Sequence, residues 1–266
     1  MNASVIITTY NRPDALAKVL EGLHHQTRPA DEIIIADDGS GPETLETIRR
    51  FERVFPRPLF HVRHEDRGFR AAEIRNKAIL KSTGDYIVLL DGDCIPTKYF
   101  LADHLALAEK GFFFQGKRVL IHKRLSTGLT HEDTASALKR LRCVFSRDVS
   151  NRQHLIRLPL FPALSATGLN GIRSCNMGFF RKDIVAVNGF NQDFIGWGRE
   201  DSELAARFLG YGLKRREHPF MAVCYHLWHE ENDRAHLGVN DEILKRTVDS
   251  NEYICSNGLV QKRKDR

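Results

Sequence analysis

Two acidic residues two positions apart, Asp91 and Asp93, directly follow an apolar run in this 266-residue chain. The run, YIVLL at 86–90, is typical of a buried strand, and buried negative charge needs a partner. Carboxylates of this kind bind Mg²⁺ or Mn²⁺ together with substrate phosphates. A polar Asp-Gly turn is the alternative interpretation. A calcium EF-hand is excluded, because the sixth and twelfth loop positions hold no glycine and no glutamate.

A second pair of acids, Asp37 and Asp38, follows another apolar run and begins a turn-forming stretch. Apolar runs alternate with helical spacing through the first half of the chain. The expected strands are 4–9, 32–36, 59–62 and 85–90, and the expected helices begin at Pro13, follow Pro42 and cover 71–81. This alternation predicts a largely parallel sheet. Because ligands gather where parallel strands end, both acid pairs are expected in one cleft, unless Asp37 and Asp38 only form a turn.

The composition is that of an ordinary globular protein, with 42% hydrophobic and 28% charged residues. No apolar run approaches the length of about 20 residues that a membrane-spanning helix needs. The N-terminal residues lack the basic and apolar regions of a secretory signal. The five cysteines are scattered and form no CxxC pair, which favours free thiols in a reducing compartment. We therefore expect a cytoplasmic protein.

The net charge of +6 suits acidic partners such as nucleotides, phospholipid head groups or nucleic acid, without choosing among them. Much of this charge lies in residues 138–157. There Leu138, Leu141 and Phe145 would form the apolar side of a basic amphipathic helix. Such a helix is expected to contact an anionic membrane at its periphery, or phosphate on a glycolipid acceptor. A solvated helix face is an equally good interpretation.

Three stretches carry a resemblance to a known family. VIITTYNRP (5–13), QTRPADEIIIADDGS (26–40) and GDYIVLLDGDCIP (84–96), in this order and spacing, resemble family 2 glycosyltransferases. The resemblance implies an α/β GT-A fold: a Rossmann-like, mainly parallel central sheet flanked by helices, a small second sheet and a helical C-terminal region. It implies one domain over 1–240, with a nucleotide-binding half (1–110) and an acceptor-binding half (111–240). Residues 241–266 would be a C-terminal helix and basic tail.

The same resemblance implies a nucleotide-sugar donor and a divalent metal. It assigns nucleotide-binding positions to Thr8, Tyr10, Arg12, Asp38, Arg70 and Asp91. The ring of Tyr10 would stack on the base, a contact worth about 1–3 kcal/mol. Asp38 would accept from N3–H of uracil, which cytosine lacks. Asp93 would bind the metal directly, and Asp91 would lie nearer the ribose or a metal-bound water.

Trp197-Gly198-Arg199-Glu200-Asp201 resembles the acceptor loop of galactosyltransferase-type and chondroitin-polymerase-type enzymes. By that resemblance Trp197 and Gly198 would contact sugar, Asp201 would be the general base and Glu200 would bind the acceptor. Back-side attack would invert the anomeric centre. As an alternative, the two acids only complement the dipole of the helix that they begin. This dipole lowers the pKa of Asp201, whereas Glu200 and burial raise it, and the sequence does not decide between them.

The stretch 222–229 is expected to be a strand that delivers histidines. By resemblance His226 would complete the metal site, with His229 as the fallback and Asn232 at a fitting distance. A nitrogen ligand beside carboxylates favours Mn²⁺ somewhat over Mg²⁺. A purely structural histidine is the alternative. Asn176, in the stretch RSCNMGFF, is expected to line the donor-sugar and acceptor pocket.

We thus predict an inverting, metal-dependent hexosyltransferase that uses a UDP-sugar and a saccharide or glycolipid acceptor. Bacterial surface polysaccharide or lipopolysaccharide synthesis, at the inner face of the plasma membrane, is the expected setting. A sugar nucleotidyltransferase is the first alternative, but it needs a glycine-rich phosphate loop where this chain has Thr8 to Pro13. A basic nucleic-acid-binding protein is the second alternative, and no reader motif supports it.

Overall fold

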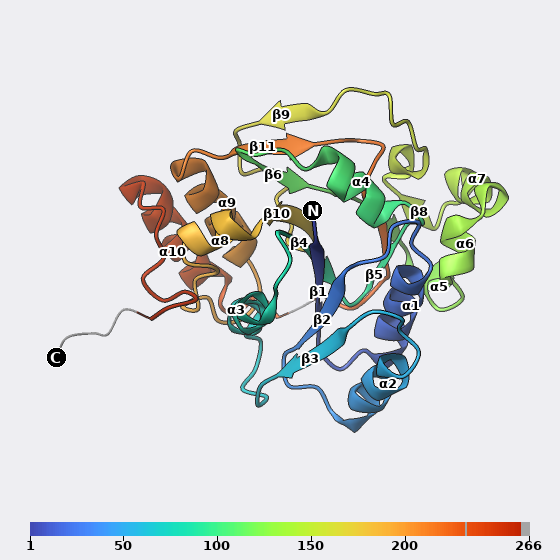
Figure 1. The fold of residues 1–266 in the computed structure, drawn as a ribbon, viewed down its shortest axis with the longest axis horizontal. Helices are drawn as coiled ribbons and strands as arrows, with labels where there is room; N and C mark the ends of the chain where they lie inside the picture. Colours follow the sequence, from blue (N-terminus) through green and yellow to red (C-terminus); the bar gives the residue numbers. More distant parts are fainter. Residues whose placement is uncertain (232, 262–266) are drawn as a thin grey trace.

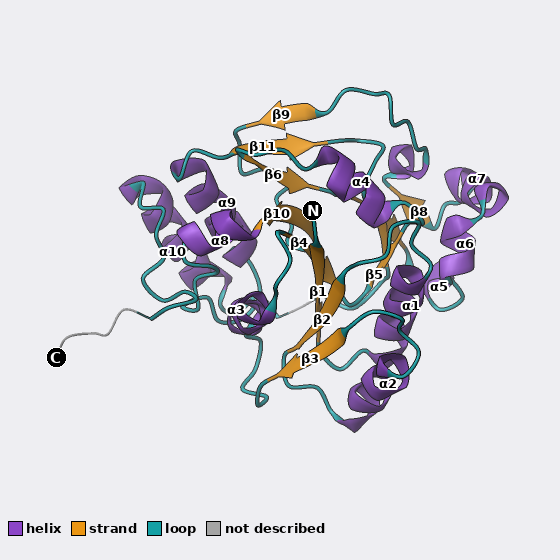
Figure 2. Cartoon of the chain, in the orientation of Figure 1, coloured by secondary structure: helices purple, strands orange, loops and turns teal. Residues whose placement is uncertain are grey.

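The computed structural model describes residues 1–231 and 233–261 (Figure 1). Asn232 and the last five residues of the expected tail, 262–266, lie outside these ranges, and the side chain of Leu141 is not described either. Figure 2 shows a large central sheet with helices around it and a smaller sheet beside it. No helix within the described ranges has both the length and the apolar character needed to cross a bilayer.

The central sheet has eight strands in the order β3-β2-β1-β4-β10-β6-β11-β9. Its first four strands are all parallel: β1 (Ala3–Thr9), β2 (Glu32–Asp37), β3 (Leu59–Arg63) and β4 (Tyr86–Asp91). The other four are β10 (Asn176–Phe180), β6 (Phe112–Gln115), β11 (Lys214–Glu217) and β9 (Leu164–Ala166). Strand β10 is antiparallel to both β4 and β6, so it joins the two halves of the chain in one sheet. The expected parallel arrangement of the first half is confirmed.

Side chains alternate between two cores because successive strand residues point to opposite faces. Val5 and Ile7 of β1 face the core beneath α1 (Pro13–His24) and α2 (Pro42–Glu52). Ile6 faces the opposite core, beneath α3 (Ala71–Lys81). Figure 1 shows α1 and α2 on one side of β1 to β3 and α3 on the other. This double cover explains the nearly unbroken apolar runs, which parallel strands buried on both faces require.

A second sheet has four strands in the order β5-β12-β7-β8. These strands are β5 (Cys94–Pro96), β12 (Val223–His226), β7 (Lys117–Ile121) and β8 (Val149–Ser150). Strand β5 begins one residue after Asp93, and its antiparallel register places Cys94 opposite His226. The strand expected over 222–229 ends at His226, so His229 lies in the following loop.

The other helices lie around the two sheets. They are α4 (Phe100–Leu107), α5 (Lys123–Ser126), α6 (His131–Ala135), α7 (Ala137–Phe145), the 3₁₀ helix η1 (Arg152–Leu155), α8 (Arg181–Ala186), α9 (Glu200–Gly210) and α10 (Leu237–Ser250). Helix α10 packs against α9 and begins at Leu237, so the boundary expected at residue 241 falls inside this helix. Helix α7 confirms the helix expected around Leu138, and both Leu138 and Phe145 are exposed to solvent.

Candidate active site

The ends of the parallel strands bring the expected chemistry together. Thr8 of β1 lies opposite Asp91 of β4, and Thr9 lies opposite Asp37 of β2. Asp38 follows directly, and its backbone N–H donates to the carbonyl of Thr9 (3.0 Å). The first-half acids therefore share one edge, as parallel strands require.

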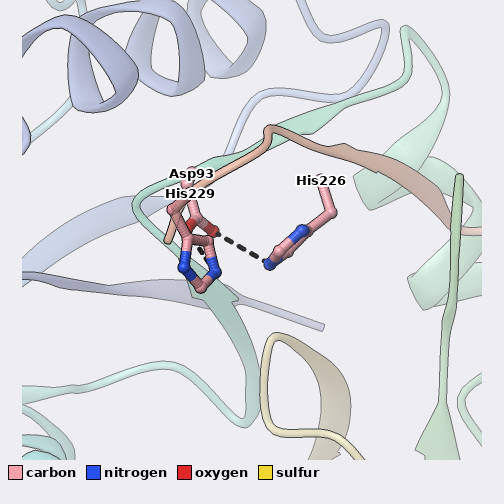
Figure 3. Close-up of side chains that lie close together, drawn as sticks. All are labelled: Asp93, His226 and His229. Carbon is pink, nitrogen blue, oxygen red and sulfur yellow. Dashed lines mark ion pairs between the residues drawn. The ribbon is translucent and has the colours of Figure 1, made fainter. Parts of the chain in front are cut away.

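Asp93, His226 and His229 form the group with metal-ligand geometry in the described ranges, with ligand atoms within 4.8 Å of one another. Nε2 of His226 lies 3.7 Å from one Asp93 carboxylate oxygen, and Nε2 of His229 lies 3.7 Å from the other. Figure 3 shows both rings beside this carboxylate. Ligands bound about 2.0–2.2 Å from one ion lie roughly 3–4 Å apart. The donor set fits a divalent cation, and both candidate histidines lie close enough to Asp93 to bind the same ion.

Burial lowers the pKa of His226 to about 4. The imidazole is therefore neutral near pH 7, and a neutral nitrogen is what a metal ion requires of a histidine ligand. One carboxylate with two imidazoles is a set that Mn²⁺ accepts more readily than Mg²⁺.

Arg12 is the positive partner of Asp93 in this structure. Its Nη1 donates to the Asp93 carboxylate at 2.6 Å, and its Nη2 donates to the backbone carbonyl of Trp228 at 3.1 Å. This places Arg12 beside the metal-ligand group. A cation bound to Asp93 would compete with the guanidinium for the same carboxylate, which would leave Arg12 available to an incoming phosphate.

Arg75 is the main site residue that sequence reasoning missed. Its guanidinium is almost fully buried and donates to three groups: Oγ1 of Thr8 at 3.0 Å, a Glu200 oxygen at 2.9 Å and an Asp91 oxygen at 3.3 Å. It thereby connects β1, β4 and α9. The sequence did contain an indication of this role. Arg75 follows Ile74 on the apolar face of the helix expected over 71–81, and a buried charge needs buried partners.

The adjacent acids Glu200 and Asp201 are held differently. Glu200 is buried and forms an ion pair with Arg75, whereas it was expected to bind the acceptor. Asp201 accepts from the backbone N–H of Ser202 at 2.7 Å and of Ser174 at 3.3 Å. Burial first, and Glu200 second, raise the pKa of Asp201 to about 6. Burial therefore outweighs the Arg75 charge and the backbone hydrogen bonds from Ser174 and Ser202, which lower this pKa.

Asp91 has the same kind of environment at the end of β4. Burial raises its pKa to about 6, the neighbouring Asp93 and Glu200 push in the same direction, and Arg75 opposes them. Two carboxyl groups near pKa 6, Asp91 and Asp201, thus flank the Arg75 guanidinium. Perturbed carboxyl groups of this kind are typical of functional sites.

The expected base-binding residues lie around Asp38. One Asp38 oxygen pairs with Nε2 of His64 at 2.6 Å, and the other accepts the backbone N–H of Arg70 at 2.9 Å. Burial raises the pKa of Asp38. The Tyr10 side chain is half-exposed, and its hydroxyl donates to Asp66 at 2.8 Å. Neither the His64 nor the Asp66 contact was expected from sequence.

The loop before α9 has the tight backbone that its glycines suggested. Gly196 and Gly198 have φ of 73° and 105°, conformations that a side chain would strain. Asn240 of α10 fixes the loop by donating to the Gly198 carbonyl at 3.0 Å. Trp197 is 37% exposed, and the Arg234 guanidinium lies over its ring at 5.5 Å. The loop thus leaves the Trp197 side chain partly exposed, four residues before Asp201.

Asn176 is placed differently from expectation. Its side chain is 1% exposed, its amide nitrogen donates to the carbonyls of Lys117 and Ala222, and its amide oxygen pairs with His104. These contacts tie the two sheets together. A buried amide with all these partners does not reach a sugar pocket, so the expected sugar contact is corrected to a structural position.

Comparison with solved structures defines the class of fold. A mannosyltransferase from Pyrobaculum calidifontis, solved with GDP-Man and Mn²⁺, superposes with a TM-score of 0.61 at 20% identity and covers 95% of this chain and 69% of its own. S. aureus TarS residues 1–349, solved with UDP-GlcNAc, gives 0.63 at 17% identity, over 87% of this chain and 60% of its own. The chain has the GT-A glycosyltransferase fold.

Sequence comparison gives the family. The family model described as Glycosyl transferase family 2 matches residues 4–157, more than half of the chain, and the model described as N-terminal domain of galactosyltransferase matches residues 165–230. The chain belongs to glycosyl transferase family 2.

Curated relatives agree with this assignment. A hyaluronan synthase of Pasteurella multocida is 29% identical over 79% of this chain and 23% of its own length. A validoxylamine A glucosyltransferase of Streptomyces hygroscopicus subsp. limoneus is also 29% identical, over 79% of this chain and 48% of its own length. The chain spans less than half the length of these relatives.

Proposed function

We propose that the protein is an inverting, divalent-metal-dependent glycosyltransferase that moves a sugar from a UDP-sugar to a saccharide or glycolipid acceptor. The observation that carries the proposal is the metal-ligand geometry of Asp93, His226 and His229, at the end of the strands that also present Asp38 and Asp91. Solved neighbours of this fold hold UDP-GlcNAc in one case and GDP-Man with Mn²⁺ in another.

The chain's own residues would hold the nucleotide at the ends of the parallel strands. The face of Tyr10 offers stacking to the base, and the Asp38 carboxylate offers an acceptor for uracil N3–H. Asp93, His226 and His229 would hold Mn²⁺ or Mg²⁺, which would neutralise negative charge on the departing diphosphate. Arg12, which now pairs with Asp93, would turn its guanidinium toward the same diphosphate.

Asp201 would take the proton from the attacking acceptor hydroxyl. A pKa of about 6 leaves its carboxylate ionised at neutral pH and makes it a stronger base than an ordinary aspartate. Glu200 is neutralised by Arg75, so the two adjacent acids have separate roles. Because no second free carboxylate is needed as a nucleophile, direct displacement with inversion is the simplest mechanism.

The setting is proposed from the relatives, which include polysaccharide synthases such as hyaluronan synthase. We propose that the enzyme contributes to a bacterial surface polysaccharide or lipopolysaccharide. Lipid-linked saccharides are presented at a bilayer, so peripheral contact with the inner face of the plasma membrane belongs to the same proposal.

A donor screen tests this function. The protein is incubated with UDP-, GDP- and dTDP-sugars, with Mn²⁺ or with EDTA, and nucleotide release is measured. The proposal expects release from a UDP-sugar that depends on metal and is lost in Asp93→Ala. Asp249→Ala is the matched control, because Asp249 is an exposed aspartate on α10, outside the metal-ligand group. Release from GDP-sugars alone, or release in EDTA, would contradict it.

A further inference from the structure

A run of exposed apolar side chains lies between η1 and β9, and we name residues 156–164 the apolar loop. Every residue from 156 to 162 is exposed to solvent. The exposed fractions of its large apolar side chains are 51% for Ile156, 46% for Leu158, 100% for Leu160, 41% for Phe161 and 51% for Leu164. Contiguous exposed apolar surface of this kind marks an interaction site.

The apolar loop is fixed in place by hydrogen bonds and ring contacts. The backbone N–H of Phe161 donates to the carbonyl of Leu158 at 3.1 Å, which closes a turn around Leu160. The buried His218 donates from Nε2 to the Phe161 carbonyl at 2.7 Å. The Phe161 ring also meets Phe220 edge to face, with ring centroids 5.0 Å apart. Leu160 is therefore held out in solvent by the fold.

The apolar loop follows a basic stretch of the sequence. Between residues 136 and 164 there are six basic residues and one acid, Asp148. Of these basic residues, Lys139 and Arg157 form ion pairs with acids outside this range, Asp133 and Asp103 respectively. Helix α7 packs against η1, which leads directly into the loop. On α7 the apolar side chains of Leu138 and Phe145 are 63% and 79% exposed, so the helix adds apolar surface to the same basic region. Figure 1 shows α7 and the connection leading to β9 along one margin of the molecule.

We propose that the apolar loop and α7 form a docking surface for an anionic lipid bilayer, in which Leu158 and Leu160 enter the interface and the exposed Arg147 and Arg152 face acidic head groups. Apolar insertion combined with basic charge is the usual basis of peripheral membrane binding. The charge argues against a second copy of this chain as the occupant, because two copies would bring two basic surfaces together.

The surface is connected to the candidate base through the chain itself. Beyond the apolar loop, β9 leads into residues 167–175, and the backbone N–H of Ser174 in this stretch donates to Asp201. A lipid-linked acceptor of the proposed function would be presented at the same bilayer. This link rests on the proposed function, whereas vesicle binding is measured without any sugar donor.

Vesicle flotation of the full chain tests the docking surface without any sugar donor. We expect binding to vesicles of phosphatidylglycerol and phosphatidylcholine, little binding to phosphatidylcholine alone, and release by high salt. Leu160→Glu should lower the partition coefficient about tenfold or more, because an inserted leucine is replaced by a charge. Arg147→Glu should lower it by about fivefold or more, because each basic residue near the surface contributes about fivefold and the variant also adds a negative charge.

Leu80→Glu is the matched control, because Leu80 is 56% exposed on α3 and should leave vesicle binding unchanged. Leu160→Glu is expected to retain donor-dependent nucleotide release, which separates failed docking from failed catalysis. Equal binding of Leu160→Glu and wild type, or equal binding to charged and neutral vesicles, would overturn the proposal. A dimer that Leu160→Glu dissociates, without vesicle binding, would assign the surface to a second copy instead.

Discussion

Asp201 and Glu200 differ in environment although they are neighbours in sequence. Arg75 binds Glu200 as an ion pair, whereas Asp201 accepts from the backbone N–H groups of Ser174 and Ser202 and from the Ser202 hydroxyl, and its pKa is raised to about 6. A carboxylate of this kind remains ionised at neutral pH and takes up a proton more readily than an exposed aspartate. The assignment of the base therefore depends on the partner of each carboxylate.

Asp201→Asn should lower the transfer rate by about 10²–10⁴-fold, the usual contribution of a general base. UDP binding should stay near normal, because the Asp201 contacts are to the acceptor half. In the wild type the rate at saturating substrate should fall about tenfold per pH unit below about pH 6, as Asp201 becomes protonated. Transfer rates measured at saturating substrate from pH 4.5 to 8 would check the loss in the variant and the pH dependence of the wild type. Loss of UDP binding in Asp201→Asn would place this residue in the donor site.

At the scale of elements, Arg75 is the contact that joins three of them. It binds Thr8 at the end of β1, Asp91 at the end of β4 and Glu200 at the start of α9. The nucleotide half and the acceptor half therefore share one buried cation. Removing one member of a buried ion pair leaves uncompensated charge, which costs more than the pair itself contributes.

Arg75→Met should lower the free energy of unfolding by about 3–5 kcal/mol, because Asp91 and Glu200 lose their cation. Urea denaturation of the wild type and the variant measures this difference. The double variant Arg75→Met/Glu200→Gln should recover part of the loss, since one buried charge has been removed. A change in Arg75→Met within about 0.5 kcal/mol would show that the buried network contributes little.

Sequence periodicity was most reliable for the first half. The helix expected over 71–81 matches α3, because buried positions recur there at helical spacing. Arg75 lies within that helix and was missed, since its partners come from residues 8, 91 and 200. Asn176 was assigned to the sugar pocket, and its amide instead joins two sheets. Contacts between distant segments depend on strand register, which local patterns do not specify.

For the molecule as a whole, burying the Asp201 carboxylate lowers the free energy of unfolding at neutral pH. The folded pKa of Asp201 is about 6, above its ordinary value of 3.8. The folded state therefore holds an extra proton between these values, so the cost is full above about pH 6 and disappears below about pH 4.

Asp201→Asn should accordingly raise the free energy of unfolding by about 1–3 kcal/mol at pH 8, because no charge is buried in the variant. The gain should shrink as the pH falls through 6 and vanish near pH 4. Thermal denaturation at several pH values measures it. Exposed Asp249→Asn, on α10, is the control and should show no such trend. A destabilised Asp201→Asn at pH 8 would mean that its backbone hydrogen bonds outweigh the cost of burial.

The central claim is that Asp93, His226 and His229 hold a divalent cation that in turn holds the nucleotide diphosphate. Calorimetric titration of UDP with Mn²⁺ and with EDTA, on the wild type, Asp93→Asn and Asp201→Asn, tests it most directly. We predict tight UDP binding by the wild type only with Mn²⁺. This binding should be lost in Asp93→Asn, because Asp93 is the acidic ligand of the metal-ligand group. It should be retained in Asp201→Asn. Equal UDP affinity with and without Mn²⁺, or unchanged affinity in Asp93→Asn, would contradict the account.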